Sequence, residues 1–581
     1  MAKKDNRSTG TFKDGIKTRL MVISALFFLF ITALIARLVS LQIVQHEALL
    51  KKSEKQYVGT VETQFGRGMI YDRNMHELAQ NVEVESVYVT PAEILNRRTT
   101  AEILSATLNL DQSKVYKKIS SKKDFVWIKR KCDLKGIDKL RQANLPGVGF
   151  LPEQKRFYPK RELAANVLGF VGIDNQGLAG IEHAHQSKLK GATIRRVTEH
   201  DARGRNIQPL EGLRDSSRKS YDIVLTLDEV IQFITEYHLK KQVARFKADS
   251  GMAVVMDPHT GEIYAMANVP QFNPNQFGAF SQQTWKNNIV ASSYEPGSIF
   301  KPIVAAAALD KKLARPQDIY FCENGNLKIG RAHIGEASDH KFGWLTMRDI
   351  IAKSSNIGAV KIAQQVGKKS FYNYIRKFGF GKKSGLSLPG ESAGQLKDQG
   401  SWNNLSLASI SFGHEIAVTP IQMISAMAAI ANGGNLMEPH IVKALIKDGQ
   451  VAEQFQPKKI RRVISEQTSL QMIEILRSAV KNGTGKKAAL EGFDLAGKTG
   501  TAQKYNMETQ SYSSTEFISS FIGFAPADSP RLVTLVMIDN PKGLHWGSVV
   551  AAPVFRQITK KTLRYLNIPS SKERVFILDR A

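Results

Sequence analysis

The sequence predicts an α+β protein attached to a membrane by one N-terminal helix, and three observations support this prediction. One long apolar run lies near the N-terminus. From residue 251 onward, short alternating strands enclose several Ala- and Ile-rich helical stretches. The 581 residues, 42% hydrophobic and 23% charged, have an ordinary composition for two or three globular domains. This composition excludes a wholly disordered chain, a collagen-like repeat and a protein with many membrane spans.

The apolar run Leu20–Ala36 contains no charged residue, and its apolar character continues past Arg37 to Val44. Because a helix rises about 1.5 Å per residue, the run before Arg37 covers roughly 25 Å of a bilayer core. The excess of basic residues at 1–19 should keep that end in the cytoplasm and place the rest outside. No small-residue cleavage site follows, which disfavours a signal peptide. We expect a cytoplasmic tail at 1–19 and a transmembrane anchor at 20–44.

Charge and cysteine content narrow the possible partners. Lys and Arg number 81 against 53 Asp and Glu, a net charge of +28 that favours anionic partners such as lipid headgroups or acidic polymers. Nucleic acid is excluded because nearly all of the chain should lie outside the cytoplasm. Cys132 and Cys322 are far apart and fit neither a zinc site nor a disulfide scaffold. His183 and His185 lack an evident third ligand, so we expect no metal and no cofactor.

The chain after the anchor predicts two domains. Residues 45–240 mix strand-like pieces, such as 84–90, with basic helical stretches, and include a polar, turn-rich segment at 194–220. A second domain is expected at 241–565, followed by a C-terminal tail at 566–581.

In the second domain, residues 251–268 alternate apolar side chains around a turn at Asp257, which predicts a hairpin. Strand-like runs return near the C-terminus. The helical stretches between them lie at 299–313, 346–366, 419–432 and 466–481. This order favours helices packed on an antiparallel sheet.

Three short motifs in the second domain carry the chemistry. Ser298 and Lys301 form an SxxK, Ser354 and Asn356 form an SxN, and Lys498 begins a KTG. SxxK alone is not specific, because the chain contains six. Ser298, however, follows a turn and precedes an apolar helix, whose N-terminus favours developing negative charge. Lys301 lies three residues on, faces the same side, and becomes a base if burial or Lys498 lowers its pKa.

The segment Gly492–Thr499 (GFDLAGKT) also matches the pattern of a nucleotide-binding loop. Such a loop requires a helix that starts at the lysine. Gly500 and the residues after it favour a strand instead, and nucleotides are scarce outside the cytoplasm. We therefore disfavour a nucleotide-binding protein.

Taken in chain order, SxxK, SxN and KTG resemble the motifs of penicillin-recognising serine enzymes. The flanking segments YEPGSIFKP, SFGHEIAVTPIQM and AGKTGTAQK are similar to class B penicillin-binding proteins, a resemblance that covers 251–556. RGMIYDRNMHELA, RFYP and GLAGIEHAHQSKLKG are similar to the non-catalytic pedestal of that family. SSN in the context LTMRDIIAKSSNIG and the short basic tail resemble the cell-division (FtsI-like) branch, with the elongation branch as the nearest alternative.

The resemblance implies an elongated, dimerisation-type pedestal at 45–240 and a β-lactamase-like transpeptidase domain at 241–565. It implies that Ser298 attacks a D-Ala-D-Ala stem peptide to form an acyl-enzyme, with Lys301 as general base. Ser354 would relay a proton to the departing D-Ala, and β-lactams would acylate the same serine.

The same resemblance implies a set of substrate contacts. Asn356 would hydrogen-bond the stem-peptide amide, and Lys498 would supply positive potential. Thr499 and Thr501 would hold the terminal carboxylate, while Gly500 would let the substrate backbone approach the strand. The backbone N–H groups of Ser298 and Thr501 would form the oxyanion hole.

Peptidoglycan cross-linking at the septum is therefore the expected function, in the bacterial cytoplasmic (inner) membrane. The expected partners are stem peptides, a membrane-embedded glycan polymerase (FtsW-like) and other division proteins. A β-lactamase or β-lactam sensor is disfavoured because no deacylating Glu follows SSN, and a non-catalytic scaffold because the motifs are intact. Met75, Glu415 and Ser548 stand where the family often has Gly, and Glu415 and Ser548 are expected to alter the edge of the cleft.

Overall fold

The structure, a computed structural model, describes residues 10–64, 66–132, 134–191, 193–200, 206–209, 220–337, 340–506 and 508–570. The chain divides into two compact units, Met1–Phe65 with Ala192–Arg218, and Gly66–Gly191 with Lys219–Ala581. Parts of the two predicted tails (1–9 and 571–581) and of the turn-rich segment (201–205 and 210–219) lie outside the described residues.

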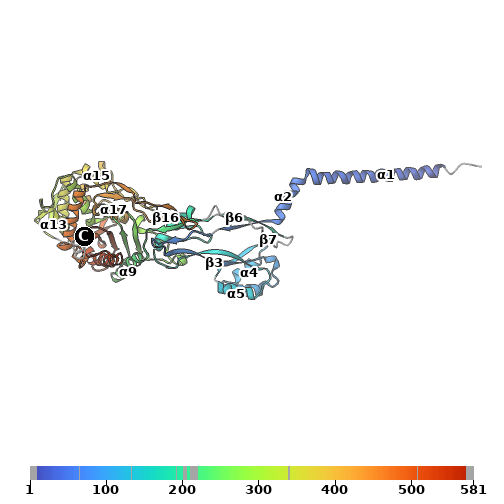
Figure 1. The fold of residues 1–581 in the computed structure, drawn as a ribbon, viewed down its shortest axis with the longest axis horizontal. Helices are drawn as coiled ribbons and strands as arrows, with labels where there is room; N and C mark the ends of the chain where they lie inside the picture. The colour runs from blue at the N-terminus through green and yellow to red at the C-terminus, as the bar shows by residue number, and fades with distance from the viewer. Residues whose placement is uncertain are drawn as a thin grey trace, which may run out of the picture. The chain divides into compact units, whose positions relative to one another are not determined.

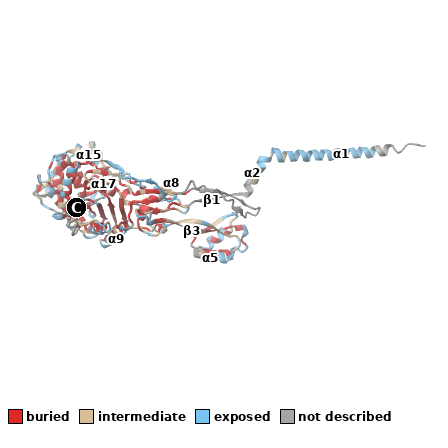
Figure 2. Cartoon of the chain, viewed as in Figure 1, coloured by how far each residue is buried: buried red, intermediate tan, exposed pale blue. Residues whose placement is uncertain are grey.

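The first unit contains the predicted anchor. Helix α1 (Gly10–Val39) continues through a π-helical turn, η1 (Ser40–Val44), and is followed by α2 (His46–Tyr57). The stretch Gly15–Val44 is long and apolar enough to cross a membrane, and its most apolar part is not buried by any other segment. Figure 2 shows α1 as exposed along its described length. The anchor prediction therefore agrees with the structure in length and composition.

A small antiparallel sheet completes this unit. Strand β6 (Thr193–His200) pairs with β1 (Val58–Gln64) on one side and with β7 (Asn206–Pro209) on the other. Two of these strands lie in the segment around 194–220 that the sequence marked only as polar and turn-rich. Local composition did not indicate them because β1, the partner of β6, comes from a distant part of the chain.

The second unit contains a five-stranded sheet in the order β10-β9-β21-β20-β19, antiparallel throughout. The strands are β9 (Ser250–Met256), β10 (Ile263–Val269), β19 (Ala496–Asn506), β20 (Ser511–Ala525) and β21 (Leu532–Asp539). The predicted hairpin at 251–268 is confirmed as β9 and β10, and the turn between them is held by Asp257, whose carboxylate accepts from the His259 amide. The α+β prediction is confirmed.

Helices cover both faces of this sheet. Alternate residues of β9 face opposite ways, so Val254 packs in the larger core and Val255 in a second one. Two helices, α9 (Glu229–Arg245) and α20 (Ala552–Tyr565), pack on the second face. The helices of the larger core are α12 (Lys301–Asp310), α13 (Met347–Lys353), α14 (Asn356–Val366), α15 (Lys368–Lys377), α16 (Asn404–Ser411), α17 (Pro420–Ala431) and α18 (Glu466–Lys481).

A second large sheet joins strands from both halves of this unit. Its path is β17-β16-β8-β2-β3-β4, with β5 also paired to β3, and only β2 and β8 are parallel. Two of its strands follow α17 in the chain, β16 (Val442–Lys447) and β17 (Gln450–Gln454), and β8 (Asp222–Leu225) precedes α9. The others are β2 (Ile70–Tyr71), β3 (Glu77–Val89), β4 (Val126–Cys132) and β5 (Val148–Phe157).

The long strand β3 leads to a helical lobe of α3 (Arg97–Leu108), α4 (Gln112–Ile119) and α5 (Leu134–Gln142), as Figure 1 shows. This lobe has its own hydrophobic cluster, which includes Val87, Leu104 and Ile137. Asn96 and Asp111 cap the first two helices, since each side chain accepts from a backbone N–H of the first turn.

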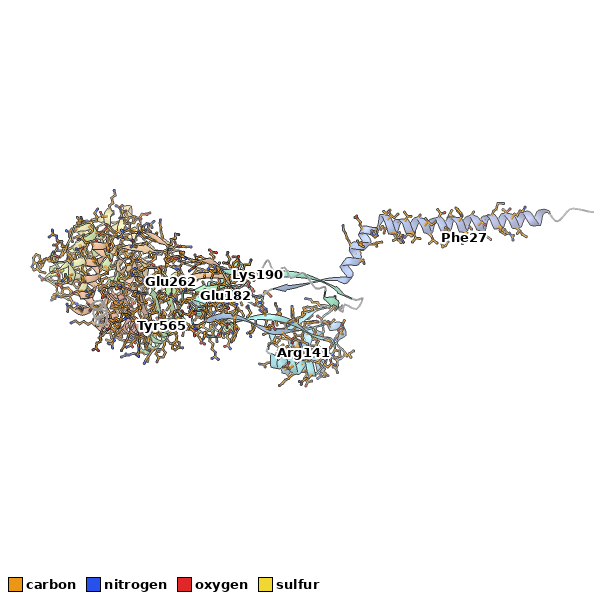
Figure 3. All side chains as sticks on the ribbon, viewed as in Figure 1. Phe27, Arg141, Glu182, Lys190, Glu262 and Tyr565 are labelled. Atoms are coloured by element: carbon orange, nitrogen blue, oxygen red, sulfur yellow. The ribbon has the colours of Figure 1, made fainter. Side chains whose placement is uncertain are left out.

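In the pedestal, three segments that resemble the family meet at one buried carboxylate, Glu182, whose position Figure 3 labels. Arg67 and Arg156 both donate to it, and Tyr158 donates its hydroxyl at 3.2 Å. All four side chains are buried. Separating any partner from such a group would leave an uncompensated buried charge, which is strongly destabilising. The contacts therefore hold the three segments in one arrangement.

Candidate active site

Ser298 lies on a short 3-10 turn, η5 (Gly297–Phe300), directly before α12. The helix therefore begins at Lys301, two residues later than the sequence predicted. Gly297 has φ +57°, a conformation that favours glycine, and its N–H donates to Gly413 O at 3.1 Å. This contact holds the turn just before the serine, which lines a cleft.

Lys301 is fully buried, and its amine is surrounded by oxygen atoms of the SxN segment. Nζ lies 2.5 Å from Ser354 O, 2.8 Å from Asn356 Oδ1 and 3.3 Å from Ser354 Oγ. Burial lowers the pKa of Lys301 to about 7, because removing water disfavours the charged amine. The lysine therefore approaches the pKa that a general base needs near neutral pH.

The SxN residues lie at the junction of α13 and α14. Ser354 ends α13 in the left-handed region, with φ +66° and ψ 37°. Ser355 caps α14, because its hydroxyl accepts from Gly358 N at 2.9 Å. A left-handed serine is strained, and such strain persists only where the surroundings hold it.

The KTG residues lie on the edge strand β19, which pairs with β20. Lys498 is fully buried, and its amine donates to Thr499 O at 3.0 Å. Burial, followed by repulsion from Lys301, holds the pKa of Lys498 well below its ordinary value. Because Lys498 lies within a strand and no helix starts there, the nucleotide-loop alternative is wrong.

These motifs meet at one cleft of about 100 Å³, which Ser298, Ser354, Thr499 and Thr501 all line. Lys301, Asn356 and Lys498 lie next to these lining residues, through the contacts given above. Within the described residues, no hydrogen bond joins the Ser298 hydroxyl to the Lys301 amine; such contacts often tighten only when substrate binds.

The packing around Gly500 leaves little room for a side chain. A Cβ at this position would lie 2.4 Å from Ser520 Oγ and 2.9 Å from Ile299 Cγ2. No side chain can therefore replace its hydrogen without moving η5 or the neighbouring strand. Its expected role toward the substrate backbone stays a prediction.

The structure adds cleft residues that the sequence did not indicate. Thr484 contacts Thr499 hydroxyl to hydroxyl at 2.6 Å, and Glu336 contacts the SxN segment. Apart from Ser548, the lining residues outside the predicted set are Glu336, Ala337, His340, Phe342, Lys353, Thr484, Trp546 and Gly547. Glu336 and Thr484 precede the motifs they contact by 15 residues or more, so no local spacing could have identified them.

The departures from the family pattern have a structural meaning. Met75 has φ +69° and Glu415 has φ +55°, so each adopts the left-handed conformation that a glycine would adopt without strain. The Glu415 N–H donates to Glu295 Oε1 at 2.9 Å, which holds this conformation. Ser548 does line the cleft, as expected of a cleft-edge position, whereas Glu415 lies outside its lining.

Within the described residues, one group of side chains has the spacing of metal ligands, Asp72, His76 and Glu229. Glu229 is already paired with Lys160 at 2.7 Å. The Asp72 carboxylate accepts three backbone N–H groups, from Asn74, His76 and Glu229. Through these contacts the Asp72 carboxylate holds the turn around Asn74 against the start of α9.

Two family models match this chain. The penicillin-binding protein transpeptidase domain matches residues 251–560, and the penicillin-binding protein dimerisation domain matches residues 62–225. The fold and the cleft thus define a penicillin-binding transpeptidase domain that follows a dimerisation domain.

The relatives agree. Stage V sporulation protein D of Bacillus subtilis is 35% identical over 546 residues, which cover 93% of this chain and 84% of that protein. The peptidoglycan D,D-transpeptidase FtsI of Escherichia coli K12 is 30% identical over 95% of this chain and 92% of its own length. Penicillin-binding protein 3 of Mycobacterium tuberculosis, solved with aztreonam, is 29% identical with a TM-score of 0.68, covering 88% of this chain and 98% of that one. This chain belongs to the class B penicillin-binding proteins.

Proposed function

We propose that this protein is a peptidoglycan D,D-transpeptidase that cross-links stem peptides through an acyl-enzyme at Ser298. The observation that supports the proposal most strongly is the meeting of SxxK, SxN and KTG at one cleft, with two fully buried lysines beside the serine. The transpeptidase machinery occupies 241–565, and the pedestal 45–240.

In the acylation step, Ser298 Oγ attacks the carbonyl between the last two D-Ala residues while its proton passes to Lys301 Nζ. Backbone N–H groups of Ser298 and Thr501 stabilise the oxyanion, a contribution of about 3–4 kcal/mol per donor. The C–N bond then breaks, and the leaving D-Ala amine takes a proton through Ser354. Lys498, Thr499 and Thr501 hold the terminal carboxylate, and Asn356 the stem-peptide amide.

In the second step, an amine of a neighbouring stem peptide attacks the ester carbonyl. The amine transfers a proton to the Lys301–Ser354 pair, and this pair returns a proton to Ser298 Oγ as the C–O bond breaks and the cross-link forms. A β-lactam would stop the cycle at the first ester, because its amine stays attached and blocks the acceptor side.

Labelling with a fluorescent penicillin tests this proposal. Ser298→Ala should abolish labelling, and Lys301→Ala should slow it by about 10²- to 10⁴-fold, the usual contribution of a general base. Ser478→Ala is the matched control, because Ser478 begins another SxxK of this chain on α18, outside the cleft. Labelling that survives Ser298→Ala, or that decays within minutes in the parent, would contradict the proposal.

We further propose a septal role, with the Gly15–Val44 helix in the cytoplasmic membrane, the N-terminus inside and the catalytic domain outside. The length of that helix and the FtsI relative support this assignment. Depletion should give long, undivided cells that still elongate; rounded cells would favour the elongation alternative. An accessible-cysteine reporter placed after the anchor should react with an impermeant reagent in intact spheroplasts.

The anchor and the pedestal are the proposed contacts with a membrane-embedded glycan polymerase of FtsW type and with other division proteins. Co-purification of such a polymerase with the parent chain should be lost when the anchor is exchanged for an unrelated one. If the polymerase still co-purifies after that exchange, the pedestal is the segment that contacts it.

A further inference from the structure

Glu336 lies at the end of the β12–β13 hairpin (Asn326–Ile329 and Ala332–Gly335), directly after β13, and lines the cleft beside Ser298. Both of its carboxylate oxygens face the SxN segment. Oε1 accepts from the Ser355 hydroxyl at 2.5 Å, and Oε2 accepts from the Asn356 N–H at 2.6 Å. Oε1 also lies 3.4 Å from Ile357 N.

These contacts orient the segment toward Lys301. The neighbouring Gly335 carbonyl accepts from Asn356 Nδ2 at 3.0 Å, so the other amide atom, Oδ1, faces the Lys301 amine. Ser354, in its left-handed conformation, lies between the C-terminus of α13 and the backbone N–H groups of Asn356 and Ile357, which contact the Glu336 carboxylate. Without the carboxylate, nothing else on the cleft side accepts from the Asn356 N–H among the described contacts.

Glu336 is also the negative charge that acts on Lys301. Burial lowers the pKa of Lys301, and the Glu336 charge opposes that effect. The other charged or titratable groups that face this amine are Lys498 on β19 and His414 in the loop after α16, and Lys353 on α13 lines the same cleft. His414 carries no positive charge near neutral pH, because burial, then Lys301, lowers its pKa to about 4.

We propose that Glu336 is a positioning residue for acyl transfer: its carboxylate fixes Ser354 and Asn356 around the Lys301 amine, and its charge sets how readily that amine accepts a proton. This inference rests on the proposed role of Lys301 as general base. Nothing in the three motifs assigns this residue, and it lies on a hairpin that the sequence did not single out.

The test is the pH dependence of acylation by a fluorescent penicillin, measured for the parent and for two variants. Glu336→Gln keeps the size of the side chain and removes the charge. It should slow acylation at neutral pH by at least tenfold. It should also move the acidic limb of the pH profile, where the rate falls as Lys301 becomes protonated, down by about one pH unit, because the loss of a negative charge favours the neutral amine. Glu336→Asp keeps the charge but draws it back by one methylene, so it should slow acylation with a smaller shift of the limb.

Glu323→Gln is the matched control. Glu323 precedes the same hairpin, on η6 (Glu323–Gly325), and its carboxylate pairs with Lys361 away from the cleft. This variant should leave both the rate and the limb unchanged. Thermal unfolding of each variant shows whether it is folded.

Two outcomes would overturn the inference: an unchanged rate in Glu336→Gln, or a slower rate with the acidic limb in its original place, which a purely structural role would give. The proposed function is judged separately by Lys301→Ala. If that variant keeps full labelling, the general-base assignment fails. If it loses labelling while Glu336→Gln leaves the limb in place, only the role of Glu336 fails.

Discussion

The pedestal and the catalytic cleft both bury charged side chains, but they surround them differently. At Glu182, two arginines face one carboxylate, and a tyrosine hydroxyl completes the group. At the cleft, Lys301 and Lys498 are both fully buried, and the charge of Lys301 disfavours a charge on Lys498. In the pedestal, side chains of opposite charge pair directly with one another and fix its geometry. In the cleft, burial lowers the pKa of both amines and so favours a base at Lys301.

The largest expected effect comes from the cleft. Lys301→Met should slow penicillin acylation by about 10²- to 10⁴-fold, because the base is lost while the volume is kept. Its free energy of unfolding should stay equal or rise, since a poorly solvated amine is replaced by an apolar chain. Labelling kinetics and urea unfolding on the same samples check both parts. Lys361→Met, on α14, is the control for labelling.

Glu182→Gln should show the reverse pattern. It leaves two buried arginines without their carboxylate, so the free energy of unfolding should fall by about 3–5 kcal/mol. The folded fraction should still be labelled at close to the parent rate, because the site lies elsewhere. Glu474→Gln, which removes an exposed pair with Arg477, should cost at most about 1 kcal/mol. An equal loss in the free energy of unfolding for Glu182→Gln and Glu474→Gln would contradict the stabilising role assigned to the buried group at Glu182.

Penicillin acylation should also depend on pH through Lys301. Since burial lowers the pKa of this amine to about 7, the protonated form predominates below that pH and cannot take the serine proton. The rate should therefore fall by about tenfold per pH unit below the limb. A limb near pH 10 would mean that the amine is solvated as in a free lysine.

Another buried carboxylate is Glu236 on α9, which accepts from Ala164 N at 2.8 Å, Gln232 Nε2 at 2.7 Å and Gln271 Nε2 at 2.6 Å. Burial raises its pKa from 4.5 to about 7. Because the folded state binds this proton more tightly, stability should fall by about 1.4 kcal/mol per pH unit as pH rises from 4.5 to 7. Urea titrations at several pH values should show this slope, and Glu236→Gln should flatten it.

The smallest expected effect is at Thr484, whose hydroxyl contacts Thr499 at 2.6 Å. Thr484→Val keeps the shape and removes one hydrogen bond of about 1 kcal/mol, so the second-order rate of acylation should fall about fivefold. A loss of a hundredfold or more would instead indicate that Thr484 contacts the substrate directly.

The sequence by itself determined the chemistry and the local elements. The spacing of SxxK places Lys301 one turn after Ser298, the alternation at 251–268 specifies a hairpin, and the apolar run specifies a helix long enough to cross a membrane. Each of these depends on residues close together in the chain, and period and spacing encode them.

Only the tertiary structure decided which distant segments meet. β6 pairs with β1, and β16 with β8, although these strands are far apart in the chain. Glu336 and Thr484 join the cleft by the same kind of long-range contact, and Ser354 takes its left-handed conformation at a helix junction. Strand partners and buried charge contacts depend on the packing of whole layers, and no local pattern records that packing.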